Sequence, residues 1–262
     1  MDVRTALITG ASSGIGAALA EALAQPGVTL HLSGRDGARL EAVAGACRGR
    51  GAVAQVAVLD VRDADAMAAW IRGAGRLDLV VANAGISGRS REGGPEDAAK
   101  TRAIFAINLD GVLNTVLPTL EAMAAQTPGA DGVRGRIVAV ASLAAFMAAP
   151  DSAAYCASKA AVHGWMIARS PEARARGMLL TSACPGFIRT PMTAGYRFPM
   201  PGLMDAGRAA RIILRGVARG RLTVVFPWWM GLAARLAGML PPRLMAAVVM
   251  RRIGQSDQGI SS

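Results

Sequence analysis

Short apolar runs alternate with stretches of helical spacing along most of this chain, and this alternation constrains its fold more than any other feature. The apolar runs are rich in β-forming residues, and the stretches between them repeat apolar residues three or four positions apart. Strands that are apolar throughout and separated by helices belong to a parallel sheet covered on both faces. The sequence therefore predicts an α/β fold with a doubly wound parallel sheet of the Rossmann type, with strands at 5–9, 28–34, 52–60, 77–85, 136–142, 178–184 and 222–226.

One domain accounts for this alternation. No internal repeat is visible, and the glycine-rich stretches 86–94 and 127–135 are typical of surface loops rather than of linkers. We expect a single domain over 1–225, followed by an apolar helical extension over 226–262. Its helices are expected at 14–25, 37–47, 64–74, 96–125, 152–168 and 205–220.

The composition narrows the classes of function. The formal net charge is +11, but the arginines are dispersed and aromatic residues make up only 4% of the chain, which is a poor surface for nucleic acid. Cys47, Cys156 and Cys184 form no Cys-x-x-Cys pair, and His31 and His163 lie in no cluster with ligand spacing. Neither a disulfide framework nor a metal site is therefore expected. We predict a cytoplasmic protein, since the N-terminus lacks the long apolar region of a signal peptide.

The stretch TGASSGIG, residues 9–16, follows the first expected strand and opens the first helix. Glycines at such a position allow a tight turn and a close approach of the backbone to a dinucleotide pyrophosphate, whose charge is met by free amides and by the helix dipole. Turns of this kind also serve plain packing. The candidate phosphate-binding residues are Gly10, Ser12, Ser13, Gly14, Ile15 and Gly16.

Tyr155 and Lys159 stand four residues apart in an expected helix, in a chain with only two tyrosines and two lysines. This spacing places both side chains on one helix face. A nearby ammonium favours the phenolate and moves a tyrosine pKa from about 10 toward neutral pH, which makes the phenol a usable proton relay. A compact ammonium also suits ribose hydroxyls better than the planar fork of an arginine. The alternative interpretation is a surface tyrosine and lysine at helical spacing.

With these motifs in order, the sequence resembles the short-chain dehydrogenase/reductase family over nearly its whole length. The other matching elements follow the third to sixth expected strands or lie within an expected helix. They are Asp60-Val61, Asn83-Ala84-Gly85, Asn108, Ser142, Tyr155-Cys156-Ala157-Ser158-Lys159 and Pro185-Gly186-Phe187-Ile188-Arg189-Thr190. The resemblance implies a nicotinamide-dependent oxidoreductase.

The resemblance also implies a role for each element. Ser142 would hydrogen-bond the substrate carbonyl, Tyr155 would transfer the proton, and Lys159 would tune Tyr155 and bind the nicotinamide ribose. Asn108 would support a water-linked proton path. Without the family, Ser142 is a strand-end cap and Asn108 is equally well a satisfied core amide. The remaining elements would bind the cofactor, with Asp60 and Val61 at the adenine, Asn83, Ala84 and Gly85 at the adenosine ribose, and Pro185, Gly186, Ile188 and Thr190 at the nicotinamide.

The end of the second expected strand distinguishes the two nicotinamide cofactors. An acidic residue there would bind the ribose 2′-hydroxyl, whereas this chain has Ser33, Gly34 and Arg35. A guanidinium suits a bidentate bond to a 2′-phosphate, so we predict NADP rather than NAD. Asp36 follows directly, and the alternative is that Arg35 is a solvated loop charge.

The sequence departs from the family at Pro171, in a span where the catalytic helix usually continues and helps to form a dimer interface. Proline removes a helix hydrogen bond and clashes with the preceding turn. We therefore expect the helix to end or kink near Arg169 or Ser170. Homo-oligomer formation through this helix is left open.

Residues 226–252 form an apolar segment broken by Arg235 and by Pro241-Pro242. It cannot supply the roughly 20 apolar residues that span a bilayer. We expect this surface to pack over the substrate cleft or against a second subunit. The alternative is peripheral contact with a membrane interface, which the paired Trp228 and Trp229 and the arginines at helical spacing upstream would suit.

The predicted function is hydride transfer between NADP(H) and a ketone or secondary alcohol through a Ser-Tyr-Lys mechanism. The methionine, phenylalanine and proline content of 186–206 indicates an apolar small-molecule substrate. The alternative from another class is an NADP-binding regulatory protein without turnover, which would need no proton relay.

Overall fold

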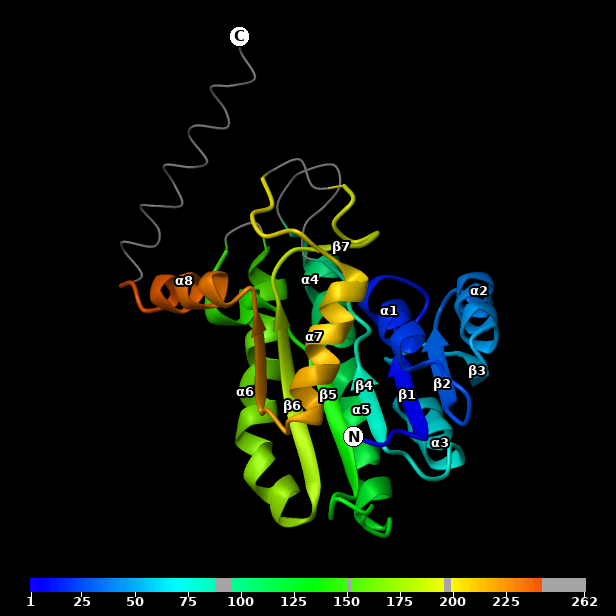
Figure 1. Ribbon diagram of the computed structural model, residues 1–262. Helices are drawn as coiled ribbons and strands as arrows, with labels where there is room; N and C mark the ends of the chain where they lie inside the picture. The colour runs from blue at the N-terminus through cyan, green and yellow to red at the C-terminus, as the bar shows by residue number, and fades with distance from the viewer. Residues whose placement is uncertain (88–95, 150–151, 196–198, 242–262) are drawn as a thin grey trace.

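A seven-stranded sheet, in which every strand is parallel to its neighbours, forms the centre of the molecule (Figure 1). The computed structural model describes residues 1–87, 96–149, 152–195 and 199–241. The strand order is β3-β2-β1-β4-β5-β6-β9, so the chain winds outward in both directions from β1, and the predicted doubly wound fold is confirmed. The strands are β1 (Thr5–Thr9), β2 (Thr29–Gly34), β3 (Val53–Val58), β4 (Leu79–Ala82), β5 (Gly135–Val140), β6 (Met178–Pro185) and β9 (Thr223–Phe226).

Helices cover both faces of the sheet. One layer consists of α1 (Gly14–Leu23), α2 (Gly37–Arg48) and α7 (Ala206–Ala218). The other contains α3 (Ala64–Gly73), α5 (Gly111–Ala124) and α6 (Ala153–Ala175). Because both faces are covered, the central strands have no solvent face, which explains why they are apolar throughout.

Successive residues of the central strands enter two separate cores. In β1, Ala6 and Ile8 pack under α1, α2 and α7, whereas Leu7 packs under α3, α5 and α6. All three side chains are fully buried. The two-residue period of a strand thus gives each helical layer its own core.

Because all seven strands are parallel, their carboxyl ends lie at one edge of the sheet. The winding direction changes between β1 and β4, since β1 pairs with both β2 and β4. Ligands of doubly wound sheets bind in the crevice at this edge. A small parallel sheet of β7 (Ile188–Arg189) and β8 (Met204–Asp205) and the helix α8 (Trp228–Gly238) follow strands that end at the same edge (Figure 1).

The helical region expected over 96–125 is divided into three parts. α4 (Ala98–Phe105) leads into a π-helical turn, η1 (Ala106–Asp110), which continues as α5. The N–H of Gly111 bonds to the carbonyl of Ala106, five residues back. Within the described residues, the span Ala98–Ala124 is long and apolar enough to cross a membrane by length and composition, but half of its most apolar window is buried inside the protein, as in a core helix.

The helix was expected to end or kink near Arg169 or Ser170. The expected end is wrong, because α6 continues through Pro171 to Ala175, and a kink there stays a prediction. The missing proline N–H would have bonded to the carbonyl of Ile167, and both residues are exposed. Water can therefore reach that side of the helix, and one lost bond near its end does not terminate it. Pro171 consequently gives no reason to exclude pairing of α6 with a second copy of the chain.

The expected apolar extension begins at the last residue of β9 and continues into α8. Gly231 of α8 lies so close to Val225 of β9 that a Cβ would collide with it, and Arg235 lies 4.7 Å from the ring centroid of Phe146. The helix therefore packs on the domain. Residues 242–262, the rest of the expected extension, lie outside the described residues, and the division of the chain at residue 225 stays a prediction.

The contact of α7 with β9 can be tested at Gly216. A Cβ at this position would collide with the Cγ2 atom of Val224, so we expect Gly216→Ala to lower the free energy of unfolding by about 1–3 kcal/mol through overpacking. Gly45 in α2 has no neighbouring atom within 4 Å of such a Cβ, and Gly45→Ala should instead raise stability by about 0.5–1 kcal/mol. Urea unfolding measures both, and equal effects of the two changes would contradict the packing described.

Candidate active site

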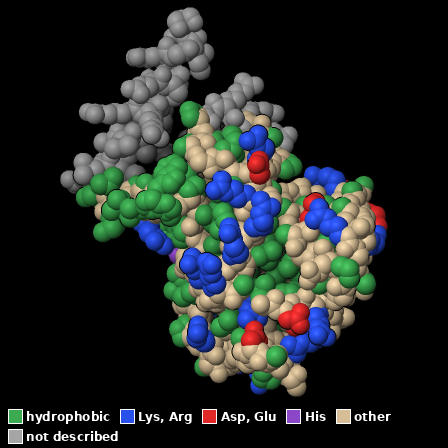
Figure 2. Space-filling view, viewed as in Figure 1, with side chains coloured by type: hydrophobic (Ala, Val, Ile, Leu, Met, Phe, Trp, Pro, Cys, Tyr) green, Lys and Arg blue, Asp and Glu red, His purple; other side chains and the backbone are tan. Residues whose placement is uncertain are grey.

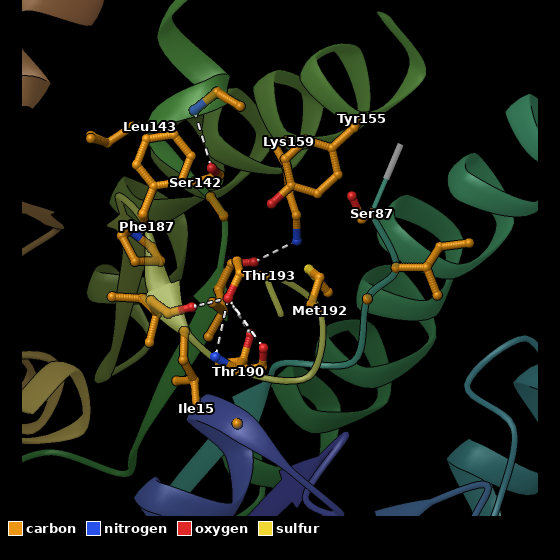
Figure 3. Close-up of a pocket in the computed structure, with 18 of the residues that line it drawn as sticks. Ile15, Ser87, Ser142, Leu143, Tyr155, Lys159, Phe187, Thr190, Met192 and Thr193 are labelled. Carbon is orange, nitrogen blue, oxygen red and sulfur yellow. Dashed lines mark hydrogen bonds between the residues drawn. The ribbon is translucent and has the colours of Figure 1, made fainter. Parts of the chain in front are cut away.

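A cavity of about 1480 Å³ lies at the carboxyl edge of the sheet. Eighteen of the twenty predicted site residues line it, and Gly16 and Asn108 lie behind its wall. Those that line it are Gly10, Ser12, Ser13, Gly14, Ile15, Arg35, Asp60, Val61, Asn83, Ala84, Gly85, Ser142, Tyr155, Lys159, Pro185, Gly186, Ile188 and Thr190. Figure 3 shows Ser142, Tyr155 and Lys159 around one part of this space, with Thr190 and Ile15 farther along it. The structure therefore brings residues from six strand ends to one site.

The glycine turn between β1 and α1 requires its glycines for different reasons. Gly10 and Gly14 have φ angles of +63° and +58°, a region that side chains disfavour. A Cβ on Gly16 would collide with the carbonyl oxygen of Gly10, so Gly16 is required for the close packing of the turn, and its contact with a cofactor stays a prediction. Ser13, the N-cap of α1, makes no side-chain bond to the helix. The first amides of α1 thus have no side-chain cap and face the cavity wall, as at an anion-binding helix N-terminus.

Two side chains hold this turn against the end of β4. The Oγ1 atom of Thr9 accepts the N–H groups of Asn83 and Ala84 at 3.0 and 3.2 Å. The side-chain amide of Asn83 donates to the carbonyl oxygens of Thr9 and Gly10 at 3.0 and 3.1 Å. The amide of Asn83 is thus committed to the protein, and only the loop that carries it borders the cavity.

Ser142, Tyr155 and Lys159 meet where β5 ends and α6 begins. Ser142 caps the 3₁₀ turn η2 (Leu143–Phe146) by accepting the N–H of Ala144 at 3.1 Å, and its own O–H remains a donor beside the cavity. Ser142 is therefore a cap at the end of the strand and also lies at the cavity, and its bond to a substrate carbonyl stays a prediction. Tyr155 and Lys159 lie one turn apart on α6, with the Lys159 amine 5.8 Å from the centroid of the Tyr155 ring.

Lys159 is the most unusual charge of the site because its side chain is only 4% exposed. Its amine donates to the carbonyl oxygen of Val140 at 2.8 Å, and no acidic side chain pairs with it among the described residues. Burial lowers the pKa of Lys159 to about 8, because the charged form loses its hydration. A lysine at a cavity wall with this environment is typical of a functional site.

The start of α6 is fixed by a residue that the sequence did not indicate. Ser152 occupies the N-cap position without making a side-chain cap bond, and the carboxylate of Glu96 instead accepts the N–H of Ala154 at 2.8 Å. A negative charge at a helix N-terminus is favourable. Glu96 therefore helps to set the position of Tyr155.

Asn108 lies in the π-helical turn and is completely buried. Its Oδ1 atom accepts the N–H of Ile86 at 2.8 Å, and its amide donates to the carbonyl of Ile86 at 3.0 Å and to Ser158 at 3.3 Å. A Cβ on Gly85 would lie 3.2 Å from this Oδ1 atom and 3.5 Å from the Lys159 amine. Asn108 is thus a satisfied amide that fixes the loop after β4 beside Lys159. Its role in a proton path stays a prediction.

The loop after β2 leaves one arginine available to the cavity. Asp36 is the N-cap of α2 and accepts the N–H of Arg39 at 3.0 Å, which lowers the pKa of that carboxyl. Asp60 is held by Arg62 at 2.6 Å, and this hydrogen bond likewise lowers its pKa. Arg35 is exposed, lines the cavity and forms no ion pair within the described part of the chain. Both neighbouring acids therefore have other cationic partners.

The segment after β6 closes the far side of the cavity through Thr193, which the sequence did not single out. Its Oγ1 atom donates to the carbonyl of Ile188 at 2.7 Å and accepts the N–H of Thr190 at 3.1 Å (Figure 3). These bonds fold the loop back on itself and fix Thr190 next to Gly14, whose Cβ would lie 3.0 Å from the Thr190 methyl.

Other cavity residues were not predicted one by one. Some lie outside every segment that the sequence assigned to the site, and their contact with the cavity depends on how α2, η2 and the loop after β4 are oriented; they are Arg39, Ser87, Leu143 and Met147. The others lie in segments that the sequence did assign to it: Phe187 and Met192 lie in the stretch 186–206, and Trp229, Met230 and Leu240 lie in the segment expected to pack over the cleft or against a second subunit.

The histidine and cysteine side chains near the site have structural surroundings. His163 bonds through Nδ1 to the Ser182 hydroxyl at 2.8 Å and packs edge-on against Phe146. Burial raises the pKa of the Cys184 thiol to about 11, so it is not an activated thiolate. All three cysteines are free and buried. No group of three metal-ligating side chains occurs in the parts of the chain that the structure describes.

Comparison with known proteins places the chain in a family. Residues 4–199 match the family model described as short chain dehydrogenase. An uncharacterized oxidoreductase of Myxococcus xanthus is 38% identical over 260 residues, which cover 96% of this chain and 98% of that protein.

Solved structures agree with this match. A short-chain dehydrogenase from Sphingobium yanoikuyae in complex with NADPH superposes with a TM-score of 0.75 at 26% identity and covers 97% of this chain and 95% of its own. A family member from Burkholderia phymatum in complex with NAD shares the fold, with a TM-score of 0.79 at 24% identity over 90% of this chain and 92% of its own. The chain belongs to the short-chain dehydrogenase/reductase family of oxidoreductases.

Proposed function

We propose that this oxidoreductase reduces an apolar ketone with NADPH, and that Ser142, Tyr155 and Lys159 carry out the proton transfer. The observation that carries the proposal is the buried ammonium of Lys159 beside the Tyr155 ring at the wall of a large cavity, with no acidic partner among the described residues. A binding protein without turnover would have no use for a charge that is costly to bury.

The cavity fits a dinucleotide by its own chemistry. The turn at Gly10 and Gly14 approaches the cavity without side chains, and the first amides of α1 have no side-chain cap. Asp60 and the loop of Asn83 to Gly85 would border the adenosine, and Ile188 with Thr190 would border the nicotinamide. Bound NADPH would supply the hydride that reduces the carbonyl carbon.

The protein groups would manage the proton and the charge on oxygen. The Ser142 O–H would donate to the substrate carbonyl and hold it next to Tyr155. Tyr155 would give its phenolic proton to this oxygen as negative charge develops there. The ammonium of Lys159 would stabilise the phenolate that remains. Asn108 would keep the loop after β4 fixed beside the Lys159 amine.

Arg35 supports NADPH over NADH. It is exposed at the end of β2, whereas Asp36 and Asp60 are engaged by Arg39 and Arg62. A guanidinium without an acidic partner suits a 2′-phosphate, which a bidentate pair recognises well. Because one solved neighbour holds NADPH and another holds NAD, this preference rests on the residues of this chain.

The apolar lining beyond Ser142 supports an apolar substrate. Leu143 and Met147 border the cavity after β5, Met192 borders it after β7, and Trp229 and Met230 border it from α8. Methionine side chains adapt to irregular apolar shapes. A ketone with a sizeable hydrocarbon portion fits this chemistry.

The proton relay can be tested with Tyr155→Phe. Only the hydroxyl is lost, so we expect kcat for ketone reduction to fall at least about 100-fold, in the range for a general acid. NADPH binding, followed by fluorescence titration, should persist and serves as the control. Substantial turnover by the Phe variant would remove Tyr155 from the mechanism.

The cofactor preference can be tested with Arg35→Gln. We expect weaker NADPH binding by about 1.5–3 kcal/mol, as for a lost charged hydrogen bond, with little change for NADH. Arg72→Gln, at an exposed arginine of α3 outside the cavity, is the matched control. Equal losses for both cofactors in the Arg35 variant would rule out the 2′-phosphate role.

The burial of Lys159 predicts a pH dependence of stability without cofactor. Its folded pKa of about 8 is below the ordinary value of 10.5, so between these values the unfolded chain binds more protons and stability rises with pH. The Lys159→Met variant has no amine to deprotonate, so its stability does not rise with pH in this range through this residue. The stability of the variant relative to the natural protein should be constant below pH about 8 and should then decrease by about 3 kcal/mol toward pH about 10.5. Chemical denaturation across this range measures it, and a difference independent of pH would contradict the buried charge.

A further inference from the structure

Helix α8 has two apolar faces, and only one of them belongs to the cavity. Trp229, Met230, Ala233 and Ala237 of α8, with Leu240 just beyond it, line the cavity. The other face points to solvent and repeats at helical spacing. It consists of Trp228, Leu232 and Leu236 of α8 and of its C-cap Met239, which are 75%, 52%, 57% and 79% exposed. We call these four residues the outer face of α8.

A stripe of arginines on α7 borders this outer face. Figure 2 shows the basic side chains over α7 beside the apolar surface of α8 on the same side of the molecule. All of these arginines are exposed, and none forms an ion pair within the described residues. They are Arg208, Arg211, Arg215 and Arg219. Asp205 is the nearby acid at the start of α7, and Arg189 neutralises it at 3.1 Å.

The sequence concentrates charge in this part of the chain. Residues 206–256 contain nine arginines and no aspartate or glutamate, so they contribute +9 of the formal net charge of +11. The remaining 211 residues are therefore close to neutral, at +2. Such asymmetry indicates an anionic partner for this segment rather than a general solubility effect.

We propose that the outer face of α8 and the arginine stripe of α7 dock on the surface of an anionic lipid bilayer. Tryptophan is enriched at the boundary of a bilayer, and a helix with an apolar face beside arginines lies in that boundary. At eleven residues, α8 is too short to span the bilayer and would lie along its surface.

A second copy of the chain is a poorer occupant of this surface. In a symmetric dimer the same patch meets itself, so the arginines of both copies would surround one apolar contact without acidic partners. An anionic lipid surface instead supplies the missing negative charge. Its attraction for arginines declines beyond about 10 Å and weakens with salt.

The position of the surface relative to the cavity also favours lipid. Trp229 and Leu240 line the cavity and are 45% and 43% exposed, so the mouth of the cavity adjoins the outer face of α8. A docked bilayer would place this mouth at its apolar boundary. This last argument rests on the proposed function, because it assumes an apolar substrate that partitions into lipid. The arguments from the apolar outer face and from the arginines do not depend on the proposed function.

Flotation of the full-length protein with lipid vesicles tests the proposal. We expect binding to phosphatidylcholine vesicles that contain phosphatidylglycerol at low salt, and release at high salt or from phosphatidylcholine alone. Leu232→Gln with Leu236→Gln, which lie outside the cavity lining, should reduce the vesicle-bound fraction about tenfold. Arg208→Gln with Arg215→Gln should reduce it similarly and weaken its dependence on salt.

Matched variants elsewhere control for composition. Val53→Gln with Val58→Gln removes two exposed apolar side chains from β3 at the opposite edge of the sheet, and Arg174→Gln with Arg176→Gln removes two exposed arginines at the end of α6. Both should bind vesicles as the natural protein does. Thermal unfolding of each variant confirms that it is folded.

Four outcomes would overturn the proposal. The first is that the natural protein does not bind anionic vesicles, and the second is that the control variants lose vesicle binding as much as the outer-face and arginine variants do. The third is that the leucine changes convert a stable dimer to a monomer and leave vesicle binding unaltered. The fourth is that the protein binds vesicles only after truncation to residues 1–241. The last outcome would identify 242–262 as the occupant of the surface. Because flotation needs no turnover, its result is independent of the activity of the Tyr155 variant.

Discussion

The close approach of the turn after β1 to the loop after β4 is the constraint on which the rest of the site depends. Gly16 packs against the carbonyl of Gly10, and the side chains of Thr9 and Asn83 tie that turn to β4. The same loop continues to Gly85, where Asn108 fixes the chain beside the Lys159 amine. A shift of the turn would therefore displace both ends of the cavity. The two ends of the cavity are thus joined by partly buried hydrogen bonds between segments that are far apart in the sequence.

Electrostatics distinguish the two ends of this cavity. At the end formed by the loops after β2 and β3, Asp36 and Asp60 each have an arginine partner, and Arg35 is exposed beside them. At the end formed by β5 and α6, the ammonium of Lys159 is buried and has a backbone carbonyl as its hydrogen-bond partner. Its pKa is lowered to about 8, so the charge is retained at neutral pH at a cost in stability. Such local cost at a site is expected where function and stability conflict.

Much of the fold and of the site could be predicted from the sequence because local rules decide those parts. Apolar strands must be buried on both sides, and two residues four apart on a helix must share a face. The errors arose where orientation or exposure decides. Pro171 does not end α6 because it lies on the solvent-exposed side of the helix, close to its C-terminal end. No distinctive residue pattern marks the π-helical turn at Asn108. Thr193 reaches the cavity through the path of its loop, and Arg39 reaches it through the orientation of the first turn of α2.

Helix α8 shows how one short element can connect chemistry to surroundings. Its inner residues complete the apolar part of the cavity, and its outer residues form an exposed apolar surface. These two faces are fixed relative to each other because Gly231 packs on β9, Gly238 on the carbonyl of Phe146, and Arg235 on the Phe146 ring. Phe146 ends the turn that Ser142 begins. Whatever contacts the outer face therefore acts on an element that packs directly against the turn carrying Ser142, so surface contact and access to the site are physically linked.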